Sequence, residues 1–332
     1  MIKLLFLLNS VLFLSNSQAN TTCPDLTNQV SCKGSPYPIH LTFDDGPSDY
    51  NTAKALNILK KEKVKGTFFV KANKLIDRHG KKSNSTHRSD KNKLKTKGIP
   101  NYYYFLLDRM KKEDHNIGSH TYNHIHHVSQ ATADIKFLRK IGEREDQWIK
   151  NIDKSNNVIL QKYLDNNGKK YLRLPYGQGW IDQRSKEPRK KRKALQIMEH
   201  IKKRGFTHVG WNIDSADWRY EKLKDTNKGE DFIRSTLQQI CDNNGGIVLM
   251  HDTKKITVDN LQCMISNMKK MNFKFKPIET FKNARTKYGL SIMGDHRKSN
   301  SSQNSCADQI DIIPQSGVDF IGNIISNLMN GN

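Results

Sequence analysis

Short apolar runs alternate with longer amphipathic stretches from residue 37 to about residue 290. The amphipathic stretches repeat at a helical spacing, as in 52–62, where Ala55, Leu56 and Leu59 share one face. The apolar runs are short and bounded by polar or turn-forming residues, as buried strands are. Strands are predicted at 39–43, 67–70, 116–118, 171–174, 206–213, 247–250 and 273–275. Helices are predicted at 52–62, 102–112, 131–150, a stretch ending near 204, 231–241 and 257–270.

This alternation predicts an α/β protein with a parallel sheet, because parallel strands need a crossover helix between them. About seven such units predict that the sheet closes into a (β/α) barrel. The 332-residue chain is expected to have four parts. These are a signal peptide at 1–19, an N-terminal segment at 20–35, the barrel domain at 36–290 and a polar C-terminal tail at 291–332.

The first residues have the pattern of an export signal. Lys3 provides the positive start, an interrupted apolar stretch covers 4–14, and 17–19 (Ser-Gln-Ala) offers a small-residue cleavage site. The apolar stretch is shorter than the ~20 residues that a membrane-spanning helix needs. We therefore expect cleavage near Ala19 and an extracytoplasmic location, with a buried N-terminal helix as the alternative.

Export leads to an oxidising compartment, so the five cysteines are candidates for disulfides. Cys23 could pair with Cys32 and staple the N-terminal segment. Cys241 could pair with Cys263 and tie two helices together, or both could be buried thiols. Cys306 would then be left over. No two cysteines form a C-x-x-C pair, which gives a cysteine-based metal or redox site little support.

The net charge of +23 comes from 56 Lys and Arg against 33 Asp and Glu. An apolar share of 35%, gathered in compact runs, excludes a polytopic membrane protein and a wholly disordered chain. The charge predicts anionic surroundings, such as nucleic acid, anionic lipid or an acidic wall polymer. Basic runs at 77–98 and 184–193 are interpreted as exposed insertions that attract anionic polymer. They contain no aromatic residue, so we expect no nucleic-acid partner.

Polar residues follow several predicted strands, at the edge where barrel enzymes place their active sites. After the first strand, 42–47 reads Thr-Phe-Asp-Asp-Gly-Pro. The adjacent carboxylates of Asp44 and Asp45 would point in different directions, so that one could bind a cation while the other stays free. A turn of this composition is common, so alone it is weak evidence for function.

Histidines gather after the third strand, where 120–124 reads His-Thr-Tyr-Asn-His. At this spacing His120 and His124 would share one helical face, which suits two imidazoles on one metal ion. His126 and His127 lie in the same stretch, so the spacing leaves the choice of ligands open. Two histidines with one carboxylate leave positions for water and substrate, as catalytic metal sites do, and no fourth ligand for a structural zinc site stands out.

Three further motifs end strands or follow them. At 173–176 (Arg-Leu-Pro-Tyr), the guanidinium of Arg173 could hold and orient a carboxylate. At 214–218 (Asp-Ser-Ala-Asp-Trp), a predicted loop places a carboxylate beside an aromatic ring. At 249–251 (Leu-Met-His), a buried strand ends in His251, and a lone histidine there is more often a packing residue than a catalytic one.

In this order and spacing, the five motifs resemble those of the polysaccharide deacetylase family, also called carbohydrate esterase family 4 or the NodB-homology domain. The resemblance covers about 36–285 and implies a distorted seven-stranded (β/α) barrel, which agrees with the strand count above. The chain departs from the family pattern at Gly66, where Ala is usual, and at Asp114, where Gly is common. The long basic insertions also depart from it, and they affect the expected substrate preference rather than the expected chemistry.

The resemblance implies a division of labour around one metal ion. Asp44 would be the general base, and Arg173 would hold it in place. Asp45, His120 and His124 would be the metal ligands, which resolves the choice among the histidines.

The remaining motifs would serve the leaving group and the substrate. His251 would be the general acid, paired with Asp217. Tyr176 would offer its backbone N–H to the oxyanion. Trp218 and Leu249 would wall the acetyl pocket.

The sequence therefore predicts a secreted, metal-dependent hydrolase that removes N-acetyl groups from glycan and releases acetate, with peptidoglycan amino sugars as the first expectation. One divalent ion is expected, zinc first and cobalt as an alternative. Chitin or its oligomers are the alternative substrate, and a non-catalytic glycan-binding module is the alternative class. The expected partner is cell-wall glycan, with no nucleic acid, no transmembrane segment and a monomeric state.

Overall fold

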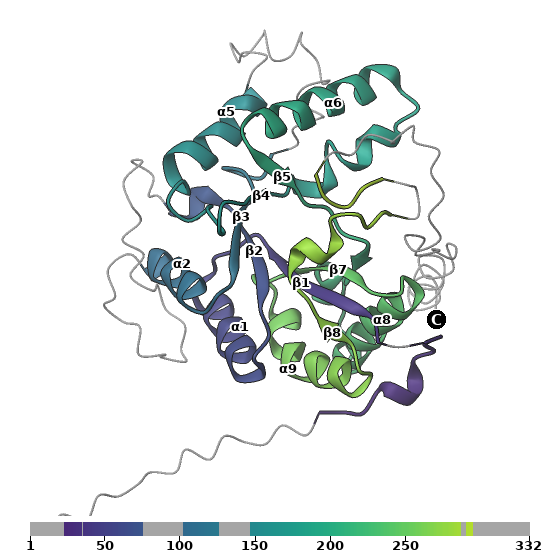
Figure 1. The fold of residues 1–332 in the computed structure, drawn as a ribbon. Helices are drawn as coiled ribbons and strands as arrows, with labels where there is room; N and C mark the ends of the chain where they lie inside the picture. Colours follow the sequence, from purple (N-terminus) through teal and green to yellow (C-terminus); the bar gives the residue numbers. More distant parts are fainter. Residues whose placement is uncertain (1–22, 35, 76–101, 126–146, 287–289, 295–332) are drawn as a thin grey trace, which may run out of the picture.

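The computed structural model describes residues 23–34, 36–75, 102–125, 147–286 and 290–294. They form a parallel sheet with the strand order β5-β4-β3-β2-β1-β7-β6, in which β8 also pairs with β1 (Figure 1). The strands are β1 (Pro38–Asp44), β2 (Gly66–Val70), β3 (Asn116–Ser119), β4 (Lys170–Leu172), β5 (Phe206–His208), β6 (Ile213–Asp214), β7 (Gly246–His251) and β8 (Lys274–Phe275). This confirms the predicted α/β class, with the sheet curled into a distorted barrel.

Helices connect the strands and pack around the curled sheet (Figure 1). They are α1 (Asp49–Glu62), α2 (Tyr102–Lys112), α5 (Gln147–Asp153), α6 (Pro188–Lys203), α7 (Asp217–Tyr220), α8 (Lys228–Asp242) and α9 (Lys255–Lys270). Short helical turns are η1 (Thr27–Gln29), η2 (Ala72–Leu75), η3 (Lys154–Ile159), η4 (Pro175–Gly177), η5 (Ile181–Arg184) and η6 (Ile278–Phe281). Within the described parts of the chain, every helix is too short or too polar to cross a bilayer.

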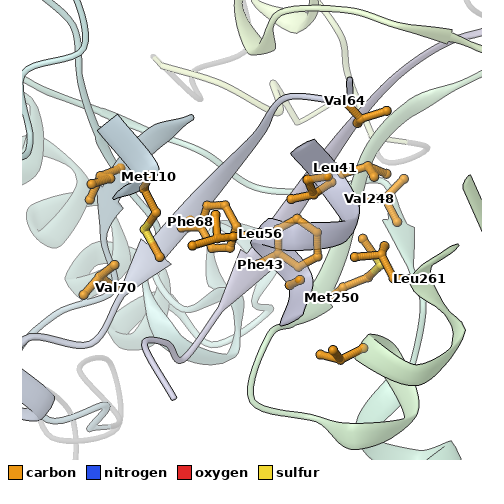
Figure 2. Close-up of a cluster of buried hydrophobic side chains, with 14 of the residues drawn as sticks. Leu41, Phe43, Leu56, Val64, Phe68, Val70, Met110, Val248, Met250 and Leu261 are labelled. Atoms are coloured by element: carbon orange, nitrogen blue, oxygen red, sulfur yellow. The ribbon is translucent and has the colours of Figure 1, made fainter. Parts of the chain in front are cut away.

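The main core fills the space between the sheet and its surrounding helices (Figure 2). Successive residues of a strand face opposite sides, so Phe68 of β2 points to the helices and stacks on Phe43 of β1, with ring centroids 4.9 Å apart. Its neighbour Phe69 belongs to a second, smaller cluster with Val209 and Ile278. The barrel therefore has an apolar interior of its own, beneath the edge that carries the polar motifs.

The predicted single strand 206–213 is wrong: the structure divides it into β5 and β6, at opposite ends of the strand order. Between them the chain crosses from β4 to β7. Val209 N–H donates to the Leu172 carbonyl at 2.9 Å, and Asn212 N–H donates to the Ile247 carbonyl at 3.4 Å. The two end strands thus approach each other without pairing, and the barrel closes through this connecting segment.

The predicted cysteine pairs are also wrong. Cys23 is bonded to Cys263, and Cys32 is bonded to Cys241, with sequence separations of 240 and 209 residues. Each bond joins the N-terminal segment to a helix, α9 for the first and α8 for the second. A hydrogen bond of 2.8 Å from Leu26 N–H to Asn267 Oδ1 supports the same contact. The N-terminal segment is therefore bonded to two helices of the barrel, and its two cysteines are not bonded to each other.

Replacing Cys32 and Cys241 together with serine is expected to lower the free energy of unfolding by about 2–4 kcal/mol. The physical reason is that the bond closes a long loop and restricts the unfolded chain. Denaturant titration measures the loss, and peptide mapping without reductant identifies the partners. A peptide that joins Cys23 to Cys32 would contradict the structure.

Several expected features lie wholly or largely outside the described residues: the signal peptide, the insertion 77–98, most of the helix at 131–150, His126, His127, Cys306 and the tail beyond residue 294. The second basic run is described: it begins at the last residue of η5 and continues into the first turns of α6. The folded part continues past the expected boundary at 290. There Ile292 and Met293 are buried, and Met293 bridges to Val209.

Candidate active site

The sheet register places the polar motifs together. Asp44 ends β1 directly beside His251, which ends β7, because these two residues are register partners. His120 follows β3, and its N–H donates to the Val70 carbonyl of β2 at 2.8 Å. Arg173 follows β4. The carboxyl ends of these parallel strands meet at one edge, so the structure brings these residues to one site, as the sequence predicted.

Asp44 is buried and fixed by Arg173. Its Oδ1 accepts a hydrogen bond from Arg173 Nη1 at 2.9 Å, and the exposed fraction of the Arg173 side chain is 0%. The same Nη1 also donates to Thr42 Oγ1 at 2.8 Å. Nε and Nη2 donate to the carbonyls of Val209 and Gly210 at 3.0 and 2.8 Å. Burial lowers the pKa of Arg173, and the nearby Asp44 carboxylate opposes that shift.

The fixed guanidinium also stacks over Phe69, 4.3 Å from its ring centroid. Through its bonds to Val209 and Gly210, Arg173 links Asp44 to the segment that closes the barrel. Asp44 Oδ1 is held by Arg173, and Asp44 Oδ2 lies 3.7 Å from His120 Nε2.

Asp45, His120 and His124 form a compact group of potential metal ligands, with one atom of each within 4.8 Å of the others. Asp45 Oδ1 lies 3.6 Å from His120 Nε2 and 3.2 Å from His124 Nε2. The opposite ring nitrogens have partners: His120 Nδ1 lies 2.8 Å from the Arg173 carbonyl, and His124 Nδ1 lies 3.1 Å from the Tyr176 hydroxyl. Both Nε2 atoms therefore face the carboxylate.

These residues fit a divalent cation. Asp45 Oδ1 is buried and has no hydrogen-bond partner among the described residues, which is a costly state for a carboxylate oxygen. A cation would satisfy it, and one carboxylate with two imidazoles is a donor set that zinc accepts.

The charges of the group suit the same cation. Burial raises the pKa of Asp45, but the nearby His120, His124, His251 and Lys71 outweigh it and leave that pKa below its usual value. Burial lowers the pKa of His124 to about 4. Asp45 is therefore ionised and His124 neutral at pH 7, the states that metal binding requires.

The prediction that His120 and His124 share one face of a helix is wrong. Residues 120–125 lie outside any helix, and Thr121 and His124 have positive φ angles of 64° and 62°. The turn is held to η2, because the carbonyl of Thr121 accepts the N–H of Ala72 at 3.1 Å and the carbonyl of Tyr122 accepts that of Asn73 at 2.9 Å. The imidazoles converge through this turn, with ring centroids 5.0 Å apart.

His251 is paired with a buried carboxylate. Its Nδ1 lies 2.7 Å from Asp217 Oδ1, and its backbone N–H donates to Asp217 Oδ2 at 2.6 Å. Thr257 Oγ1 donates to the same Oδ2 at 2.5 Å. Burial alone would lower the pKa of His251. The Asp217 contact, with the charges of Asp44 and Asp45, instead raises it to about 9.

The expected substrate residues lie on the elements that carry the site residues. Leu249 precedes His251 on β7 and is buried, whereas Trp218 on α7 is 39% exposed. Arg219 and Lys222 lie against the Trp218 ring, 4.7 and 5.7 Å from its centroid. Tyr176 is 55% exposed and has a φ angle of 59°.

Sequence reasoning missed three supporting contacts. The Tyr176 hydroxyl contacts His124, and Thr257 donates to Asp217, the carboxylate that pairs with His251. Asp252 is fully buried behind the Asp45–Gly46 turn, where a Cβ on Gly46 would lie 2.3 Å from its Oδ2. Burial raises the pKa of Asp252 to about 7, and Thr52 Oγ1 donates to its carboxyl group. The only signal in the sequence was its position directly after His251.

A (β/α) barrel with a carboxylate–imidazole cluster at its carboxyl edge defines the chain as a barrel protein with a hydrolase-type site. The family model described as Polysaccharide deacetylase matches residues 33–198, which is half of the chain. The chain therefore belongs to the polysaccharide deacetylase family, whose members are hydrolases.

Relatives and a solved structure agree with this assignment. The chain is 26% identical to the peptidoglycan-N-acetylglucosamine deacetylase of Listeria monocytogenes, over 73% of this chain and 38% of that protein. It is 30% identical to a chitin deacetylase of Arthroderma benhamiae, over 73% of this chain and 50% of that protein. The catalytic domain of a Eubacterium rectale peptidoglycan N-acetylglucosamine deacetylase shares the fold, with a TM-score of 0.50 and 21% identity over 82% of this chain and 97% of that one. The chain thus spans half or less of these two curated relatives.

Proposed function

We propose that this chain is a metal-dependent hydrolase that removes N-acetyl groups from the amino sugars of a cell-wall glycan and releases acetate. The observation that carries the proposal is the pair of adjacent carboxylates. Asp45 Oδ1 has no hydrogen-bond partner among the described residues and faces two imidazoles, while Asp44 is fixed by Arg173 beside them. Asp45 would hold a cation, and Asp44 would remain available to take a proton.

Asp45, His120 and His124 would hold the ion. When bound, the ion supplies Lewis acidity, which polarises an acyl carbonyl and acidifies water. Asp44 would accept the proton of the attacking water, through the oxygen that Arg173 does not hold. Tyr176 would donate its backbone N–H to the developing oxyanion, a contribution of the kind that is typically worth about 3–4 kcal/mol.

His251 would protonate the departing amine, which leaves poorly without a proton. Its Nδ1 is engaged by Asp217, so Nε2 is the nitrogen that can donate. The Asp217 carboxylate keeps the ring charged near neutral pH. Leu249 and Trp218 would contact the acetyl group.

We propose peptidoglycan as the first substrate and an extracytoplasmic location. The net charge of +23 and the export pattern of residues 1–19 support both. Chitin is the second candidate, favoured by the identity to a chitin deacetylase. A non-catalytic glycan-binding module is less well supported, because such a module would not need all of Asp44, the three ligand candidates and His251.

One assay tests the proposal. Purified protein with added Zn²⁺ is incubated with peptidoglycan and with chitin oligomers, and acetate is measured from both. Release from peptidoglycan above that from chitin is the expected result. Release from chitin alone would make chitin the substrate, and release from neither would contradict the proposed activity.

Turnover is expected to fall as pH rises through about 9. The pKa of His251 is raised, so its imidazolium form is present below this value and is lost above it. The rate of acetate release under saturating substrate, followed between pH 6 and pH 11, measures the decline.

Asp217→Asn provides the control for this assignment. Asp217 contributes most to the raised pKa of His251, and the amide removes its charge, so that only Asp44 and Asp45 then oppose the effect of burial. The alkaline decline should therefore move to lower pH in the variant. A decline that stays in place would mean that another group titrates.

A further inference from the structure

A groove of about 810 Å³ runs along α6, away from the residues assigned above. Its described lining includes both ends of the helix, from Pro188 to Lys203, so it follows about 24 Å of helix at 1.5 Å per residue. Trp148 of α5, Gln183 of η5 and Gly294 complete the described walls. The proposed activity leaves this groove unused.

The groove combines strong positive charge with apolar surface. Lys191 and Arg192 lie at one end, and Lys202 and Lys203 lie at the other. Between them Leu195 is 42% exposed. Glu199 is the only acidic residue in the described lining, 3.9 Å from Lys203. The surface thus suits a long ligand that has both apolar faces and negative charges.

The local helix electrostatics oppose this placement of cations. The first turn of α6 has no acidic residue, although the positive end of a helix dipole favours acidic side chains there. Arg189, Lys190, Lys191, Arg192 and Lys193 instead occupy five consecutive positions. Lys190 pairs with Asp182 at 3.0 Å, while Lys191 and Arg192 are exposed in the groove. The arrangement lowers helix stability, which favours a role in binding.

The topology connects the groove to the active-site edge. Strands β4 and β5 are parallel neighbours, so α6 must run back from the carboxyl edge to the amino edge of the sheet. Its basic first turns therefore begin at the edge that carries Arg173. The short segment between Tyr176 and Gln183 joins the active site to the groove wall.

We propose that the α6 groove is a docking surface for a glycan strand that carries carboxylate groups, and that it holds the strand while the active site acts on another of its sugars. This inference rests on the proposed function for the identity of the strand. The carboxylates would contact Lys191 and Arg192 at the end nearer the active site. The apolar faces of the sugar rings would pack near Leu195.

Two N-acetylated polymers test the proposal: carboxymethyl chitin, which carries carboxylates, and glycol chitin, which is uncharged. The full chain is compared with the double variant Lys191→Gln, Arg192→Gln. At low salt we expect the Kd for carboxymethyl chitin to rise about tenfold, and the effect to shrink near 1 M salt, where the screening length is about 3 Å. The Kd for glycol chitin should change less than twofold, and kcat on a short neutral chitin oligomer should stay the same.

Arg189→Gln with Lys193→Gln is the matched control. It removes the same charge from the same turns, at two residues outside the described lining of the groove. An equal loss in both double variants, or no loss in the first, would overturn the docking surface. Double-stranded DNA that binds as tightly as carboxymethyl chitin, with the same dependence on Lys191 and Arg192, would overturn the glycan assignment. Normal polymer binding without any acetate release would contradict the proposed activity and leave the docking surface standing.

Discussion

Replacing Asp44 with asparagine is expected to lower kcat by about 10²–10⁴-fold, the usual contribution of a general base. Asparagine keeps the size of the side chain and can still accept the hydrogen bond that Arg173 Nη1 donates at 2.9 Å. It cannot take a proton from water. Metal content should stay close to that of the unaltered chain, because Asp45 and the two histidines are untouched. Acetate release and metal analysis of the same preparation measure both quantities.

Asp214→Asn is the matched control for this variant. Asp214 is a half-buried carboxyl group at a strand end, and its Oδ1 accepts the Ala216 N–H at 2.9 Å. Asparagine can preserve that contact, so most of the activity should remain. Loss of bound metal in Asp44→Asn would reverse the assigned roles of Asp44 and Asp45. Equal loss of activity in both variants would point to a general effect of removing a carboxyl group at a strand end.

The convergence of the site could be predicted from the sequence because it depends on local order. Several strands end in a short polar motif, and parallel pairing brings these ends to one edge. No knowledge of the loops was needed to expect Asp44, His120, Arg173 and His251 near one another. Their individual roles came from the family resemblance, and they remain proposals that the geometry supports.

The features that the sequence could not predict depend on distant contacts or on turn geometry. The run 206–213 looks like one strand because its hydrophobicity does not show that Val209 pairs with Leu172 while Asn212 pairs with Ile247. The disulfide partners are more than 200 residues apart, and the spacing of the cysteines contains no information about which helices the N-terminal segment crosses.

The backbone conformation of the histidine motif could not be predicted from the sequence either. A spacing of four residues suits one face of a helix, and it also suits the turn that the structure contains. The positive φ angles of Thr121 and His124 are unusual for residues other than glycine. The hydrogen bonds from η2 that support this turn come from a segment almost 50 residues earlier. The convergence of the two rings does not require a helix, so this part of the expectation did not depend on the backbone conformation.

Arg173 shows how closely the site depends on the way the barrel closes. Its guanidinium donates to the carbonyls of Val209 and Gly210, which lie in the connection between the two end strands. Its own carbonyl is the partner of His120 Nδ1. The same residue therefore positions Asp44 through its side chain and His120 through its backbone, and a shift of the closing segment would disturb both.

The second large effect is expected from His120→Ala and His124→Ala, each of which should reduce bound metal strongly. Losing a hydrogen-bond partner of a metal-binding histidine typically costs 10–100-fold in affinity, about 1.4–2.7 kcal/mol. Losing the imidazole itself should exceed that range. We expect the larger loss for His120, whose side chain is 2% exposed against 19% for His124. Calorimetric titration with Zn²⁺ measures both affinities.

Two further variants separate loss of a ligand from a general disturbance. Tyr176→Phe removes only the hydroxyl beside His124 Nδ1, so its affinity for Zn²⁺ should fall by about 10–100-fold and no more. His200→Ala removes an imidazole that pairs with Asp153 at 3.0 Å, outside the candidate metal group, and should leave the affinity unchanged. Unchanged Zn²⁺ affinity in both ligand variants would mean that Asp45, His120 and His124 do not share a cation.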